Sequence, residues 1–325
     1  MADPGIGWRI LLTAAMAEPP DAGVVLDRLD ELFTRQKWGG AAEVRRDDDV
    51  AGLRSRLTEA TTPVVVGVAG DSVVVSAHHA WVDGLGLLTV LSEVVGSPVA
   101  SLVRGVADRP MRGGLARAAG RRLVEALLRP PAGISSASAS GGGGDVFAEL
   151  TVPGSWRTAA LVHAAAQGVV RHNRGAGRRT GHLAVAVGAG RPGSEDERIA
   201  DRSALLRLTD LEDRSLQEIE ELLRAAPLEP PPTANGRTGA RALRGGMKLL
   251  SRRLGSTLLV SHLGEVRAEG VTGLAFHPVT AGGSGVSLGA VTLRDSTTLT
   301  LRARAARWDT AGLHRLLSAI AEELG

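Results

Sequence analysis

The chain alternates between short apolar runs and segments whose apolar residues recur at helical spacing. Residues 8–16 form an apolar run of strand length, and residues 24–33 and 85–95 place apolar side chains every three or four positions, as on one helix face. A run of acids precedes residues 50–60, which also favours a helix there. The runs 64–69 and 72–77 are joined by Gly70-Asp71, which predicts a β-hairpin.

The same two patterns continue in the second half of the chain. We expect helices at 155–173, 216–225 and 310–324, and strands at 146–152, 182–187, 204–209, 257–261, 286–293 and 297–303. Some predicted strands follow one another directly and others are separated by helices, so the order is not the regular strand–helix alternation of a parallel α/β fold. The pattern therefore predicts an α/β (α+β) two-lobed sandwich, in which mixed β-sheets are flanked by helices.

A low-complexity stretch divides the chain. Residues 104–129 are arginine-rich and predicted to be helical, Pro130-Pro131 stops that helix, and residues 135–144 consist entirely of serine, glycine and alanine. Serine and glycine at this density favour a flexible coil. We expect an N-terminal lobe at 1–130, a linker at 131–144 and a C-terminal lobe at 145–325.

Composition excludes several classes of function. There is no cysteine, which rules out thiol nucleophiles, thiolate metal sites and disulfides. The net charge is only +3 and aromatic residues make up 2% of the chain, which argues against nucleic-acid binding. No apolar stretch approaches the ~20 residues of a membrane span, and no basic region precedes an apolar core at the N-terminus. We expect a cytoplasmic protein.

The candidate chemistry lies where a predicted strand ends and a predicted helix begins, at His78-His79. A histidine there is held by the strand, and its ring can accept a proton from an alcohol or amine near neutral pH. The alternative is a structural pair that closes the strand. Neighbouring residues on a strand point to opposite faces, so we expect no metal site. The spacing leaves open whether Asp83 touches His79.

The segment His78-His79-Ala80-Trp81-Val82-Asp83-Gly84 resembles the HHxxxDG signature of the chloramphenicol acetyltransferase-like superfamily. That superfamily includes nonribosomal peptide condensation domains, wax ester/diacylglycerol acyltransferases and polyketide-associated acyltransferases. Two weaker similarities lie further along. Residues 183–192 are similar to a family strand that ends in Arg-Pro, and residues 258–264 are similar to a strand reading Ser-Asn, with His262 in place of the asparagine.

The resemblance implies an enzyme that moves an acyl group from a thioester to a hydroxyl or amine, with His79 as the general base. It implies that His78 supports the turn and that Asp83 is ion-paired with an arginine, for which Arg191 is preferred over Arg35. It also implies that Gly84 keeps a tunnel open beside the base.

Possible substrate or oxyanion contacts are Ser261, His262, Ser284 and Ser287. The glycine-rich loop that contains Ser284 lacks the following helix and the lysine of a phosphate-binding loop.

The resemblance further implies no tightly bound cofactor. The co-substrate would be acyl-CoA or an acyl-phosphopantetheinyl carrier, the partner an acyl or peptidyl carrier protein, and the acceptor a small molecule. The arginines of residues 104–129 are either a solvated helix face or a docking surface for such an acidic partner. The alternative function is a non-catalytic module that binds a carrier protein.

Overall fold

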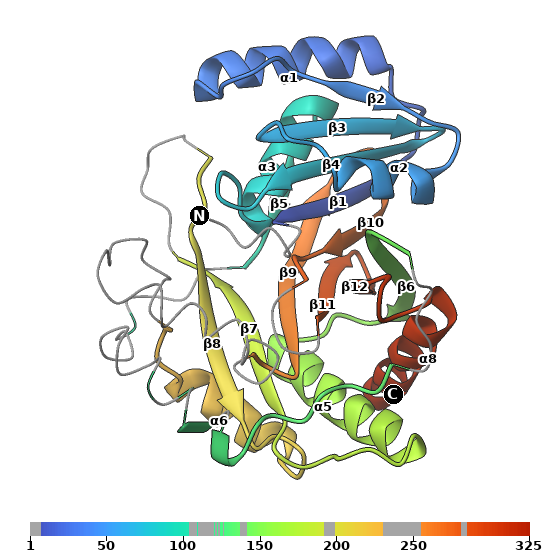
Figure 1. Ribbon diagram of the computed structural model, residues 1–325. Coiled ribbons are helices and arrows are strands. Elements are labelled where there is room, and N and C mark those ends of the chain that lie inside the picture. Colours follow the sequence, from blue (N-terminus) through green and yellow to red (C-terminus); the bar gives the residue numbers. More distant parts are fainter. Residues whose placement is uncertain are drawn as a thin grey trace, which may run out of the picture.

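The computed structural model describes residues 8–103, 109, 120, 122, 124–125, 127–136, 142–191, 199–229, 255–280 and 285–325. Its framework is a pair of mixed β-sheets, one in each lobe (Figure 1). The N-terminal sheet has the strand order β10-β1-β4-β3-β2. Its strands are β1 (Arg9–Met16), β2 (Val44–Arg46), β3 (Val64–Ala69), β4 (Ser72–His78) and β10 (Val271–His277). Its helices are α1 (Ala22–Gln36), α2 (Val50–Leu57) and α3 (Gly84–Val95).

The C-terminal sheet has seven strands in the order β6-β12-β11-β9-β7-β8, with β5 paired to β9. Its strands are β5 (Val99–Ser101), β6 (Asp145–Pro153), β7 (Ala184–Gly190), β8 (Ser203–Thr209), β9 (Leu258–Ala268), β11 (Val286–Leu293) and β12 (Ser296–Arg304). Its helices are α5 (Thr158–Gly175), α6 (Leu216–Ala225), α8 (Thr310–Ala321) and the short 3₁₀ helix η1 (Glu322–Leu324). This arrangement confirms the predicted fold class.

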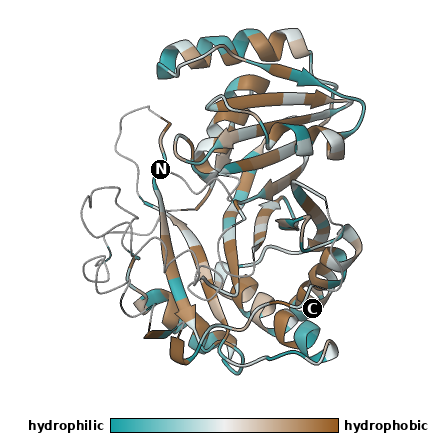
Figure 2. Ribbon diagram, in the orientation of Figure 1, coloured by the Kyte–Doolittle hydropathy of each residue, from teal (hydrophilic) through white to brown (hydrophobic). Residues whose placement is uncertain are grey.

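Alternation along β9 explains how one strand serves two hydrophobic cores. Leu258 and Val260 pack in the C-terminal core with α5 and α8, whereas Leu259 and Leu263 pack in the N-terminal core with α1 and α3. Successive side chains of a strand point to opposite faces, so β9 separates the two cores. The strands of both sheets are correspondingly hydrophobic in Figure 2. α2 covers the other face of the N-terminal sheet.

The predicted division of the chain does not separate the sheets. β10 comes late in the sequence but lies in the N-terminal sheet, where it pairs antiparallel with β1 from Leu11↔His277 onward. The sequence analysis predicted no strand at residues 271–277. In addition, the first half of the predicted linker is packed: Ala132 and Ile134 are buried in the C-terminal core, and the Ser135 N–H donates to Asn173 Oδ1 at 3.0 Å. Residues 137–141 and most of 104–119 lie outside the described residues.

A buried arginine joins the two lobes. Arg302 on β12 donates to Asp145 Oδ2 on β6, through Nε at 2.7 Å, and to the carbonyl oxygen of Arg9 on β1 at 2.6 Å. The side chains of Arg302 and Asp145 are 0% and 1% exposed. Arg304, partly exposed, contacts the other Asp145 oxygen at 3.0 Å. The charge on Arg302 is therefore neutralised within its own sheet, while its remaining donor fixes the start of β1.

Arg302→Met should destabilise the protein by about 3–5 kcal/mol, because it leaves the Asp145 carboxylate buried without its main partner. Arg304→Met is the matched control and should cost about 0–1 kcal/mol, because Arg304 is partly exposed. Urea unfolding of the two variants measures the difference. Equal losses would contradict the role assigned to Arg302.

A second polar contact joins the two sheets, between His277 on β10 and Glu149 on β6. The His277 Nε2 lies 3.0 Å from Glu149 Oε1 on β6, and Arg54 on α2 is ion-paired with the same carboxylate. A carboxylate only accepts, so Nε2 carries the proton. Burial lowers the pKa of His277 to about 4. His277 is therefore neutral near pH 7.

This burial makes stability depend on pH. The folded-state pKa of His277 lies below its unfolded value of about 6.5, so the unfolded chain binds a proton that the native protein does not between about pH 6.5 and 4. The contribution of His277 to the free energy of unfolding should be fully present above pH 6.5. It should fall by on the order of 3 kcal/mol as the pH drops through that window. His277→Gln keeps a donor to Glu149 and should flatten the dependence measured by urea unfolding. An unchanged slope would refute the assignment.

Candidate active site

Residues 79–83, which we call the His79 turn, join the end of β4 to the start of α3 and are fixed by backbone hydrogen bonds. The His79 N–H donates to the carbonyl of Trp8 at 2.7 Å, and the Trp81 N–H donates to the carbonyl of His78 at 2.9 Å. Trp81 is 50% exposed, so an indole projects from the turn into solvent. The residues between the strand and the helix thus have a defined path.

His79 combines a buried ring nitrogen with partial exposure. Its side chain is 21% exposed, and Nδ1 lies 3.7 Å from Asp201 Oδ1. Nδ1 is buried and has no hydrogen-bond partner among the described residues. The exposed surface of the His79 side chain therefore lies on atoms other than Nδ1.

His78 supports the turn from behind. Its Nδ1 accepts the N–H of Ala80 at 3.2 Å. Burial, the charge of Arg9 and the neighbouring His79 lower the pKa of His78 below its ordinary value. A neutral His78 ring can accept this hydrogen bond, which an imidazolium cannot.

Asp83 does not form the predicted ion pair with either arginine. Arg35 pairs instead with Glu93 at 2.7 Å, and Arg191 is exposed and contributes a backbone N–H to the carbonyl of Arg202 at 3.0 Å. The Asp83 carboxylate accepts two backbone N–H groups, from Gly86 at 2.7 Å and from Arg202 at 3.1 Å. Asp83 is the N-cap of α3, and a side-chain acceptor at that position satisfies a free N–H of the first turn.

Gly84 packs closely against two side chains of the N-terminal lobe. A Cβ atom at Gly84 would lie 2.7 Å from Leu263 Cδ2 and 3.3 Å from Phe276 Cζ. Both side chains belong to the N-terminal core. The glycine therefore lets α3 begin close against β9 and β10.

The predicted contacts on β9 and β11 are not brought together. Ser261 shares the face of Leu259 and Leu263, toward the N-terminal lobe, and pairs with Gly188 and Gly289 on the neighbouring strands. His262 points to the opposite face, where its Nδ1 lies 3.2 Å from Thr158 Oγ1 on α5. Burial lowers the pKa of His262 to about 4, so its ring is neutral near pH 7.

Of the two remaining serines, the structure describes Ser287. Ser287 is 0% exposed, and its hydroxyl donates to the carbonyl of Pro278 at 3.4 Å. A hydroxyl without exposed surface does not reach a substrate in this conformation. Ser284 lies outside the described residues.

The sequence analysis missed the segment of residues 199–203, which we call the strap. The strap leads into β8 and lies against the turn that follows β4, where Arg202 donates to Asp83 and Asp201 approaches His79. At its start, the Ile199 N–H donates to Gln36 Oε1 at 3.0 Å. The strap follows a polar, acid-rich stretch without hydrophobic periodicity. No sequence signal places it beside His79.

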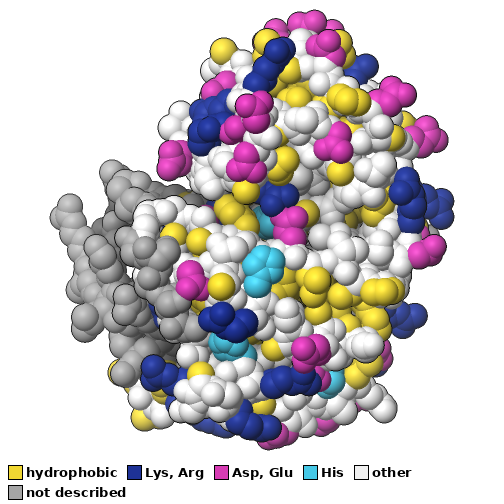
Figure 3. Space-filling model, turned by 90° about the vertical axis from the view of Figure 1, so that its right-hand side faces the viewer, with side chains coloured by type: hydrophobic (Ala, Val, Ile, Leu, Met, Phe, Trp, Pro, Cys, Tyr) yellow, Lys and Arg dark blue, Asp and Glu magenta, His cyan; other side chains and the backbone are white. Residues whose placement is uncertain are grey.

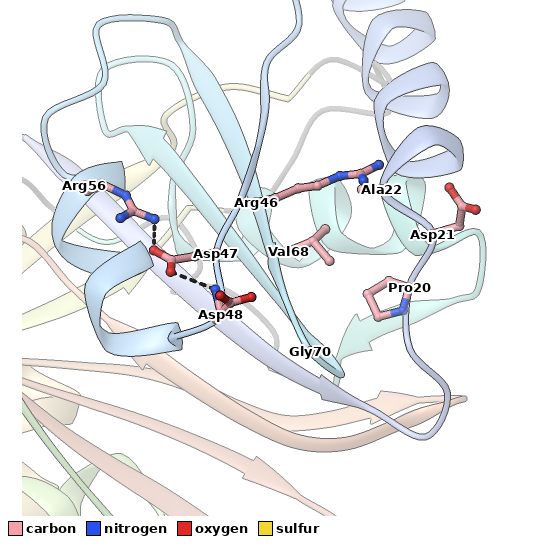
Figure 4. Close-up of a pocket in the computed structure, with 9 residues that line it drawn as sticks. All are labelled: Pro20, Asp21, Ala22, Arg46, Asp47, Asp48, Arg56, Val68 and Gly70. Atoms are coloured by element: carbon pink, nitrogen blue, oxygen red, sulfur yellow. Dashed lines mark hydrogen bonds and ion pairs between the residues drawn. The ribbon is translucent and has the colours of Figure 1, made fainter.

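The pocket drawn in Figure 4 lies elsewhere on the N-terminal lobe. Its volume is about 690 Å³, and its lining includes Asp21, Arg46 and Gly70. Gly70 is in the turn between β3 and β4, at the opposite end of β4 from His78. Seven strand residues separate the two ends by roughly 20 Å. This pocket is therefore not the predicted channel beside His79.

Within the described ranges, no group of three or more His, Cys, Asp or Glu side chains is arranged to hold a metal ion. In the same ranges, no helix is both long and apolar enough to cross a bilayer. The face shown in Figure 3 intersperses acidic and basic side chains. It carries no single field of positive charge of the kind that binds nucleic acid.

No family model and no curated protein matches the sequence. Solved structures do match the fold. A variant of the starter condensation domain of rhizomide synthetase in complex with C8-CoA superposes with a TM-score of 0.57 and 14% identity, over 98% of this chain and 89% of that one. The cyclization-docking bidomain of EpoB from Sorangium cellulosum gives 0.56 and 12%, over 98% and 80%. The epimerization domain from the third module of tyrocidine synthetase B gives 0.51 and 11%, over 97% and 90%.

The chain has the condensation-domain fold. This confirms the chloramphenicol acetyltransferase-like architecture implied by the HHxxxDG resemblance. Within this fold, the turn that follows β4 is held by the carbonyl of Trp8, which accepts the His79 N–H, and by the strap, through the Arg202 N–H.

Gly84→Ala should destabilise the protein by about 1–3 kcal/mol, because the added methyl group overlaps Leu263 in a packed core. Gly133→Ala is the control, since a Cβ there meets no atom within 4 Å. Thermal unfolding compares the two. If Gly84→Ala were neutral for stability, the close packing described here would be wrong.

Proposed function

We propose that this protein is an acyltransferase that moves an acyl group from a thioester to a hydroxyl or amine acceptor, with His79 as the general base. The observation that carries the proposal is the orientation of His79. Its Nδ1 is buried near a carboxylate, while the side chain as a whole keeps 21% of its surface exposed. A general base has to reach the proton that it removes, and a nearby carboxylate favours the imidazolium that then forms.

The proposed reaction is a direct transfer. His79 Nε2 accepts the proton of the acceptor hydroxyl or amine, and the acceptor atom attacks the thioester carbonyl carbon. The new C–O or C–N bond forms as the C–S bond breaks, and the departing thiolate takes the proton from the imidazolium. The products are an ester or amide and a free thiol. The thioester supplies the leaving group, so the reaction needs no nucleophile from the protein.

The donor is proposed to be acyl-CoA or an acyl-phosphopantetheinyl carrier. A solved structure with this fold was determined in complex with C8-CoA, and another with C8-CoA and Leu-SNAC. These ligands support a thioester donor here, although they were bound by proteins of 14% identity. The small-molecule acceptor is left open between alcohols and amines.

His79→Ala should lower acyl transfer by about 10²–10⁴-fold, because the acceptor loses its general base. The assay follows thiol release from a series of acyl-CoA and acyl-pantetheine donors with alcohol and amine acceptors. The chain has no cysteine, so a thiol reagent reports only the leaving group.

The matched control is His314→Ala, which removes an exposed histidine on α8 and should leave the rate unchanged. Activity that survives His79→Ala would refute the base. A wild-type protein that binds a carrier protein but transfers no acyl group would instead support the non-catalytic module.

A further inference from the structure

The strap brings a carboxylate to the buried side of the proposed base. Asp201 Oδ1 lies 3.7 Å from His79 Nδ1, within ion-pair distance, and the two side chains are 35% and 21% exposed. This oxygen also accepts the N–H of Ser203 at 2.9 Å and its hydroxyl at 2.5 Å. Ser203 thus fixes the carboxylate group while it faces the histidine ring.

The environment of Nδ1 leaves Asp201 as its partner. Nδ1 is buried and makes no hydrogen bond with the part of the chain that the structure describes. A buried ring N–H without an acceptor is unfavourable. The separation exceeds a hydrogen bond by about 1 Å, and catalytic hydrogen bonds are often long before substrate binds.

We propose that Asp201 is the positioning residue for His79. Its carboxylate accepts the Nδ1 proton, which fixes the tautomer with a bare Nε2 that the base needs, and it stabilises the imidazolium formed when His79 takes the acceptor's proton. Asp201 stays ionised throughout, and no proton passes to it. The inference rests on the proposed function and adds a residue that the HHxxxDG signature does not contain.

The signature aspartate explains how Asp201 reaches this place. The Asp83 Oδ2 accepts the N–H of Arg202, the residue directly after Asp201. The strap is also tied to α1 through Ile199 and Gln36. Asp83 therefore acts on the base indirectly, because it holds the segment that carries the second carboxylate.

Other charged groups also face this turn. They are His78 on β4, Arg9 on the adjacent strand β1, Asp83 before α3 and Arg202 on the strap. The Asp83 carboxylate is committed to two backbone N–H groups, and His78 accepts from Ala80. Of the two carboxylates near this turn, Asp83 and Asp201, it is Asp201 that lies within 4 Å of a His79 ring nitrogen.

The test is Asp201→Asn, which keeps an acceptor for Ser203 but removes the charge. The plateau of kcat/KM should fall about 10- to 100-fold. The acid limb of the pH profile should move to lower pH by about 1 unit, because loss of a nearby negative charge makes the imidazolium easier to deprotonate. Asp201→Glu should restore part of the rate. A variant that loses rate without moving the limb would show that Asp201 is merely structural.

A second readout does not depend on turnover. The His79 ring resonance, assigned by its loss in His79→Gln, is followed by NMR as a function of pH in the wild type, in Asp201→Asn and in Asp71→Asn. Asp71 is the control, since it lies in the turn at the far end of β4, beyond the ~8 Å screening length at physiological salt.

The His79 titration midpoint should fall in Asp201→Asn alone. An equal midpoint in all three proteins overturns the inference. Absence of acyl transfer by the wild type would overturn the proposed function and still leave the NMR comparison to decide the role of Asp201.

Discussion

The Asp83 carboxylate accepts one hydrogen bond from each lobe, and the geometry of the candidate site depends on this bridge. One oxygen accepts the N–H of Gly86 and so caps α3, the helix that follows the His79 turn. The other holds Arg202 on the strap that leads into the C-terminal sheet. The side chain is only 7% exposed, so water competes poorly for either bond. A single buried group thus sets the distance between His79 and the strap.

The surrounding packing leaves this bridge little freedom. Gly84 lets α3 approach Leu263 and Phe276 closely, so the helix start is set against two strands from the C-terminal half of the chain. Arg302 also ties β12 to the carbonyl of Arg9 at the beginning of β1. The residue just before it, Trp8, accepts the N–H of His79. Interiors packed at this density transmit small shifts. Both lobes therefore contribute contacts that support the His79 turn.

Much of the fold was predictable from local pattern. The hairpin across Gly70-Asp71, the helix after Gly84 and the helix that begins at residue 310 were all expected and are all present. β10 was not, although the Glu269-Gly270 turn between two apolar runs is a hairpin signal. Its alternation is blurred because residues 274–277 are buried on both faces, between β1 and the C-terminal sheet.

The site was predictable only as far as the signature extends. His78, His79 and Asp83 are adjacent in sequence, so their spacing fixes their turn. The prediction that Asp83 pairs with an arginine was wrong, because two backbone N–H groups satisfy its carboxylate instead. Charge complementarity in the sequence does not reveal such backbone donors. Asp201 lies in a polar segment with no periodicity, far along the chain. Only tertiary contacts identify it.

The placement of β10 has a consequence for synthesis on the ribosome. β1 ends at Met16 and pairs on one side with β4, but its neighbour on the other side, β10, begins at Val271. At about 5–20 residues per second, on the order of tens of seconds pass between the emergence of the two strands. During that time the outer edge of β1 is open to pairing with other nascent chains. The N-terminal lobe therefore completes its sheet only after residues 271–277 have been synthesised.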